Sequence, residues 1–236
     1  MTSIYGMTEA GLKKTGRDAR VLPKTVIYDP ELTLSLPTAI SITSGINAVA
    51  HAVEALYACD RNPITEMMAE EGIRTIAKAL PVIKQSPRDV DARHNALYGA
   101  WLCGTVLGNT GMALHHKLCH TLGGAFNLPH AELHTVILAQ VVSFNAADVP
   151  DAMRRIKRAL EGYETSSAAA ALFDLAKENG ASVALKDIGS ITEADLARAA
   201  DLAVQTPYWN PRPVGPTQRN DIYQLFLRAY YGERPH

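Results

Sequence analysis

Histidines are concentrated in one segment, residues 111–134, which reads GMALHHKLCHTLGGAFNLPHAELH. Five of the eight histidines lie here, and His116/His120 and His130/His134 are pairs four residues apart. On a helix, this spacing puts both imidazoles of a pair on one face. Imidazoles can bind a divalent metal ion, or bind an anionic substrate and transfer protons. A single helical histidine is usually structural, but five among glycines and small apolar residues favour a functional site.

Turn residues separate the two histidine pairs. Gly123-Gly124 and Asn127-Leu128-Pro129 are typical of the end of one helix and the start of the next. We therefore predict two helices that meet at a corner, with histidines of both directed into one space.

A third group of polar residues lies on the helix predicted over residues 37–59. Its apolar residues recur every three or four positions, whereas Asn47, His51 and Glu54 form a polar stripe among alanines. Alanines do not solvate a helix face, so we expect this stripe to face the interior. His51, His116 and His130 could together hold Zn²⁺ or Fe²⁺, for which Asn47 would be a poor, neutral fourth ligand. The same imidazoles could also act without a metal, and the spacing leaves both readings open.

Composition excludes several classes of protein. The 236 residues carry a net charge of −1, which gives no indication of a nucleic-acid partner. No apolar run approaches the roughly 20 residues of a membrane span. Three cysteines without a secretory signal indicate reduced thiols and a cytoplasmic protein, and we read Cys119 as a small buried residue rather than a nucleophile. Neither G-x-G-x-x-G nor a P-loop occurs, so nothing in the chain would hold a dinucleotide by itself.

The predicted elements fall into two parts. Residues 1–28 differ from the rest, with short strands expected near residues 3–8 and at Lys24–Tyr28 and a polar loop over residues 11–20. From Asp29 onward the pattern is helical, and Gly99, Gly104 and Gly108 would allow close helix packing. Helices are predicted over residues 37–59, 62–84, 91–108, 129–145, 151–160, 166–179 and 217–230. One further helix is predicted in the histidine segment before Asn127, and another begins at Thr192. The fold class is therefore mainly α.

Three motifs carry a family resemblance. SGINAVAHAVEAL (residues 44–56), GNTGMALHHKLCHTLGGAFNLPHAE (108–132) and NPRP (210–213) resemble the iron-containing alcohol dehydrogenase family, and within it the maleylacetate reductase branch. The resemblance implies an α/β nucleotide-binding domain followed by an all-helical domain of the dehydroquinate-synthase-like type. Residues 1–28 would then be the remnant of the first domain and residues 29–236 the helical substrate domain. The glycine-rich phosphate-binding turn would precede Met1, so we expect a truncated chain that alone binds NADH weakly and has no measurable reductase activity.

The resemblance also assigns site residues. The metal ligands of the family fall on Asn47, His51, His116 and His130, and its further active-site histidine falls on His120. Metal-dependent members have Asp at the position of Asn47, and the maleylacetate reductase branch is generally regarded as not needing metal. A metal is therefore not expected to be required, although His51, His116 and His130 would hold one if it bound.

The implied activity is the reduction by NADH or NADPH of the conjugated double bond of maleylacetate to give 3-oxoadipate, in the degradation of aromatic compounds. The expected catalytic group is His51, His116, His120, His130 and Asn47, with His115 and Lys117 accessory or at the surface and His134 left open. Nucleotide contacts would come from Leu32 to Leu36 and from a lysine matching Lys14. A cytoplasmic homodimer acting on a small dicarboxylate is expected, without nucleic acid or membrane. The alternatives are a metal-dependent alcohol dehydrogenase of the same family and an inactive helical fragment.

Overall fold

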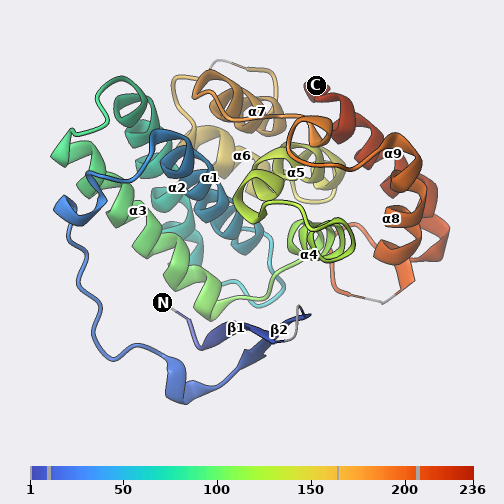
Figure 1. The fold of residues 1–236 in the computed structure, drawn as a ribbon, viewed down its shortest axis with the longest axis horizontal. Coiled ribbons are helices and arrows are strands. Elements are labelled where there is room, and N and C mark those ends of the chain that lie inside the picture. Colours follow the sequence, from blue (N-terminus) through green and yellow to red (C-terminus); the bar gives the residue numbers. More distant parts are fainter. Residues whose placement is uncertain (1, 10–11, 164, 206–207) are drawn as a thin grey trace.

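The structure is a computed structural model that describes residues 2–9, 12–163, 165–205 and 208–236, without the side chains of residues 8, 9 and 12–15. In this part of the chain, a two-stranded hairpin precedes a body of helices (Figure 1). The helices are α1 (Thr38–Ala55), α2 (Pro63–Gln85), α3 (Val90–Asn109), α4 (Leu114–Phe126), α5 (His130–Asn145), α6 (Pro150–Ala159), α7 (Ala168–Glu178), α8 (Glu193–Gln205) and α9 (Arg219–Tyr231). The mainly α fold class is confirmed, and none of these helices is long and apolar enough to cross a membrane.

The N-terminal segment differs from its prediction in two places. Strands β1 (Ile4–Glu9) and β2 (Leu12–Arg17) pair antiparallel, with Ile4 opposite Arg17, so most of the expected loop at residues 11–20 is a strand. The strand expected at Lys24–Tyr28 is absent from the structure, and Ile27 there is 85% exposed. β-propensity produces a strand only where a partner is available, and the hairpin supplies one locally. The division at residue 28 stays a prediction.

Close packing against α2 fixes the position of α1, which carries the polar stripe. A Cβ atom at Gly45 would lie 2.8 Å from Leu80 Cδ2, so the helices touch through the glycine. Helix α3 approaches α2 in the same way, since a Cβ at Gly99 would lie 2.6 Å from Ile76 Cγ1. The prediction that Gly99 allows close helix approach is confirmed. Cys59, the last residue of the helix predicted over residues 37–59, lies beyond the end of α1 and is exposed.

Helix α5 lies at the centre of the helical body, between α1–α3 and α8–α9 (Figure 1). Its ten residues from Leu133 to Val142 are all buried. Leu138, Ala139 and Val142 belong to the hydrophobic cluster formed with α1, α2, α6 and α7. Leu133, Val136, Ile137 and Val141 belong to a second cluster, formed with α4, α8 and α9. The element that bears His130 and His134 is therefore held from both sides.

Candidate active site

The predicted corner is present between α4 and α5, but Gly123-Gly124, which were also expected to form it, lie within α4. Helix α4 ends at Phe126, the next residue Asn127 has a left-handed backbone with φ 50°, and Pro129 is the N-cap residue of α5. Asparagine tolerates this conformation better than most residues, which explains why the chain can reverse here without glycine. The short connection brings the histidines of the two helices together.

Ring contacts join histidines from three helices. The imidazole centroid of His116 lies 4.7 Å from that of His51 and 6.2 Å from that of His120. The rings of His130 and His134 are 4.3 Å apart, and His134 is 5.0 Å from His116. The structure thus groups all four histidines of the predicted catalytic set with His134. We call the four histidines of the predicted set, together with Asn47, the histidine cluster.

A carboxyl group missing from the predicted site connects the helices. Glu54 on α1 is 0% exposed. Its Oε1 accepts a hydrogen bond from the backbone N–H of His115 at 2.7 Å. Its Oε2 accepts from the backbone N–H of Ala113 at 2.9 Å and lies 2.6 Å from Nδ1 of His116. The signal in the sequence was the position of Glu54 on the polar stripe, three residues after His51.

Two buried polar atoms of the cluster have no hydrogen-bond partner among the described residues. They are Nε2 of His116 and Oδ1 of Asn47. Buried polar atoms are normally satisfied, so two unpartnered ones at predicted site positions indicate where a ligand binds. Burial, together with electrostatic repulsion from neighbouring imidazoles, lowers the pKa of His51 to about 3, so its ring is neutral at neutral pH.

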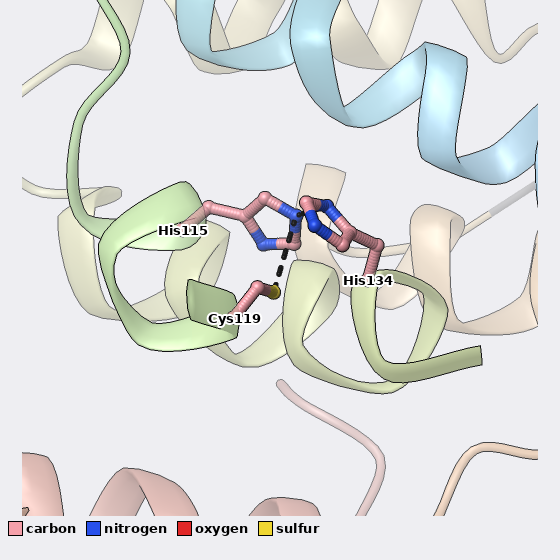
Figure 2. A group of neighbouring side chains, drawn as sticks. All are labelled: His115, Cys119 and His134. Carbon is pink, nitrogen blue, oxygen red and sulfur yellow. Dashed lines mark hydrogen bonds between the residues drawn. The ribbon is translucent and has the colours of Figure 1, made fainter. Parts of the chain in front are cut away.

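A second pair of histidines lies behind the cluster. Nε2 of His115 is 2.9 Å from Nδ1 of His134, and Sγ of Cys119 is 3.8 Å from the same His115 nitrogen (Figure 2). His115 and His134 are both 0% exposed, and burial lowers the pKa of each imidazole. His115 was expected to be accessory or at the surface, and the surface alternative was wrong, because α4 turns this residue toward α5. Cys119 is buried as predicted, and burial raises the pKa of its thiol.

Two sets of side chains offer metal ligands. His115, Cys119 and His134 have ligand atoms within 4.8 Å of one another. However, their outer nitrogens, His115 Nδ1 and His134 Nε2, have no partner in the described structure, and the imidazole–imidazole hydrogen bond accounts for their placement. His116 fits a divalent ion better, because a metal-binding histidine usually has its other nitrogen held by a carboxylate. The ring centroid of His116 lies 4.7 Å from that of His51, whereas the ring of His130 contacts that of His134. A metal ion held by His51, His116 and His130 therefore stays a prediction, and Asn47 would add no negative charge to it.

The three residues expected to contact the nucleotide all precede α1 in the sequence. Leu32 is 79% exposed on a 3-10 turn over Glu31–Thr33. Leu36 lines a cavity of about 130 Å³ with Ser41 and Gly45, and no histidine contributes to it. The side chain of Lys14 lies outside the described residues. These three assignments stay predictions.

The family model "Fe-containing alcohol dehydrogenase family, C-terminal" matches residues 41–230, and the chain belongs to this family. The expected resemblance is thereby confirmed.

Individual proteins of this family are similar to the chain over its whole length. Maleylacetate reductases of Pseudomonas sp. (strain P51) and Delftia acidovorans are each 58% identical to the chain over 235 residues. The crystal structure of maleylacetate reductase from Agrobacterium tumefaciens is 52% identical, with a TM-score of 0.93 over 99% of this chain. All of this chain matches the two sequence relatives, but it spans only 65% of their length.

Proposed function

We propose that the protein is an NAD(P)H-dependent maleylacetate reductase, which converts maleylacetate to 3-oxoadipate. The relatives of that name support the proposal along the whole of this chain. The observation that carries it is at Asn47, which presents a buried, unpartnered amide oxygen at the position where a carboxylate was expected in metal-dependent members. A site without an acidic residue among the predicted ligand positions suits a substrate that is itself a dianion.

The reaction makes two demands on the site. Hydride from the nicotinamide ring adds to the alkene carbon β to the ketone, and the electron pair of the double bond moves to the ketone oxygen to form an enolate. A proton then returns to the carbon α to the ketone, and the nicotinamide leaves oxidised. The protein must therefore stabilise a negative oxygen and supply one proton.

The described side chains can meet these demands. His51 is neutral and can donate one ring N–H, while the ring of His116 is held in place by Glu54. His120 and His130 are exposed at the rim of the cluster, where a substrate carboxylate would enter. An aspartate in place of Asn47 would bury a charge of the same sign as the substrate, at a cost of several kcal/mol. We assign His51, His116, His120 and His130 as donors and Asn47 as a neutral orienting group.

The cofactor assignments belong to the same proposal. NADH or NADPH supplies the hydride, with Leu32, Leu36 and Lys14 as predicted contacts. We propose that a metal is not required. If one is bound, His51, His116 and His130 would hold it, and it would polarise the ketone oxygen as a Lewis acid. We also propose a cytoplasmic homodimer that binds neither nucleic acid nor membrane.

The test is an assay of the protein at its native length after dialysis against a chelator. Oxidation of NADH or NADPH with maleylacetate, and 3-oxoadipate as the product by mass spectrometry, are expected. Asn47→Asp should lower kcat/KM for maleylacetate by at least about tenfold, the effect of roughly 1.4 kcal/mol. Oxidation of simple alcohols that depends on added Fe²⁺ or Zn²⁺ would instead support the metal-dependent alternative. Failure with every substrate would support a non-catalytic helical protein.

A further inference from the structure

Glu54 is a carboxyl group buried completely within the protein. Removing such a group from water is costly unless hydrogen bonds replace the lost hydration. Three N–H groups do so here, two from the backbone and one from His116. Because backbone N–H groups can only donate, both oxygens act as acceptors, and we assign Glu54 as a carboxylate with Nδ1–H of His116 as its third donor.

The two backbone contacts tie α1 to the beginning of α4. The first N–H groups of a helix have no partner within the helix, and a negative charge at that end is favourable. Ala113 precedes α4 and has no side chain that could cap it. Glu54 takes this capping role from another helix, at 2.9 Å from the N–H of Ala113 and 2.7 Å from that of His115.

The third contact controls one ring of the histidine cluster. Nδ1 of His116 lies 2.6 Å from Oε2 of Glu54, which fixes the ring orientation and leaves Nε2 as the free nitrogen. That Nε2 is buried and has no partner in the described part of the chain. It lies on a ring whose centroid is 4.7 Å from that of His51. One carboxylate therefore sets both the place of the helix and the rotation of the imidazole it carries.

We propose that Glu54 is the positioning residue of the site and acts through His116, holding its Nε2 toward the substrate. The proposal rests on the proposed function of the histidine cluster for its effect on rate. Its structural part, the control of the His116 ring, does not depend on which substrate the protein reduces.

Asp60 provides a matched control. Its carboxylate accepts from the backbone N–H of Gly111 at 2.9 and 3.0 Å, two residues before Ala113. It thus anchors the same connection between α3 and α4, but its two hydrogen bonds there go to backbone alone. Asp60→Asn should disturb the connection without releasing the His116 ring.

The experiment compares Glu54→Gln with Asp60→Asn in the protein at its native length. Glu54→Gln is expected to lower kcat for maleylacetate about 10- to 100-fold, the usual effect of losing a carboxylate behind a functional histidine, with KM for NADH changed less than about twofold. Asp60→Asn should change kcat less than about threefold, since Asp60 does not hold a ring. Equal losses in the two variants would show a merely structural role and overturn the proposal.

Nitrogen NMR of protein labelled with ¹⁵N-histidine supplies a readout independent of rate. In the wild type, His116 should show a protonated Nδ1, and the signal is assigned by its absence in His116→Gln. Glu54→Gln should give a mixture of tautomers, because a glutamine amide can both donate and accept. An unchanged His116 signal would refute the proposal even if wild-type protein does not reduce maleylacetate.

Glu54→Asp covers the case in which Glu54→Gln does not fold. It keeps the charge but withdraws the oxygens by one methylene. A lowered kcat with an altered His116 nitrogen signal is then expected, and wild-type values for both would overturn the proposal.

Discussion

His115 and His116 are neighbours in sequence but have opposite surroundings. His116 has a buried carboxylate on one ring nitrogen and an unpartnered nitrogen on the other. His115 has only another imidazole, that of His134, and a weakly polar thiol beside it. Adjacent residues on a helix point about 100° apart, so a single turn of α4 faces two different environments.

The difference shows what a buried histidine needs in order to be functional. Without an opposite charge, burial keeps the His115–His134 pair neutral, and the pair serves packing. With Glu54, His116 is oriented and keeps one nitrogen for a ligand. Four changes test this contrast.

The largest expected effect is on stability at acidic pH. His51, His115 and His134 have folded-state pKa values below the ordinary value of about 6.5, so below that pH the unfolded chain binds protons that the folded chain does not. As the pH is lowered below about 6.5, the free energy of unfolding should fall by about 1.4 kcal/mol per pH unit for each histidine. Above about pH 6.5 it should stay level. Urea unfolding between about pH 7.5 and 5.5 measures the slope. A level profile would mean that these histidines keep the pKa of the unfolded chain in the folded protein. His94→Gln, at an exposed histidine, serves as the control.

Next in size is the loss of the pair itself. His115→Ala leaves Nδ1 of His134 without a partner and opens a cavity between α4 and α5, so it should cost about 2–4 kcal/mol of unfolding free energy. Chemical denaturation of the variant and of His94→Ala makes the comparison, with less than about 0.5 kcal/mol expected for the exposed residue. A cost below about 1 kcal/mol at His115 would contradict a packing role, by the same scale.

In the histidine cluster, Asn47→Asp on α1 should strengthen metal binding. It places an anionic oxygen one helical turn before His51, where the amide oxygen of Asn47 is now buried and unpartnered. We expect the affinity for Zn²⁺ or Fe²⁺ to rise about tenfold or more, equivalent to roughly 1.4 kcal/mol, in calorimetric titration. Equal affinities in wild type and variant would mean that Asn47 does not face His116 and His130.

The smallest effect is expected at the thiol. Cys119→Ala removes a single weak contact with His115 and a small buried volume, for a cost of about 1 kcal/mol in the free energy of unfolding. Cys59→Ala, at an exposed cysteine, should cost less than about 0.5 kcal/mol. A larger loss at Cys119, accompanied by release of a bound metal, would show that the thiol, His115 and His134 form a metal site.

The sequence predicted those parts of the site that depend on helical periodicity. The four-residue spacing of His116/His120 and His130/His134, and the turn at Asn127, were sufficient to predict the corner. Periodicity identifies the face of a helix but not the residue that it meets. The contacts of Glu54 with α4 join residues at least 59 positions apart in the sequence. His115 and His134 are 19 positions apart, so neither set of contacts could be predicted from a local sequence pattern. The error at Lys24–Tyr28 has the same origin, since a strand requires a partner that its own residues do not specify.

The position of α5 has a consequence for how the protein opens. Because its residues belong to both hydrophobic clusters, neither cluster can separate without exposing this helix. Its backbone amides should therefore exchange with solvent only through global unfolding, whereas the hairpin at residues 4–17 should exchange through local opening. His134 would then occupy the most protected element of the molecule, and the site should disappear in the same transition as the core.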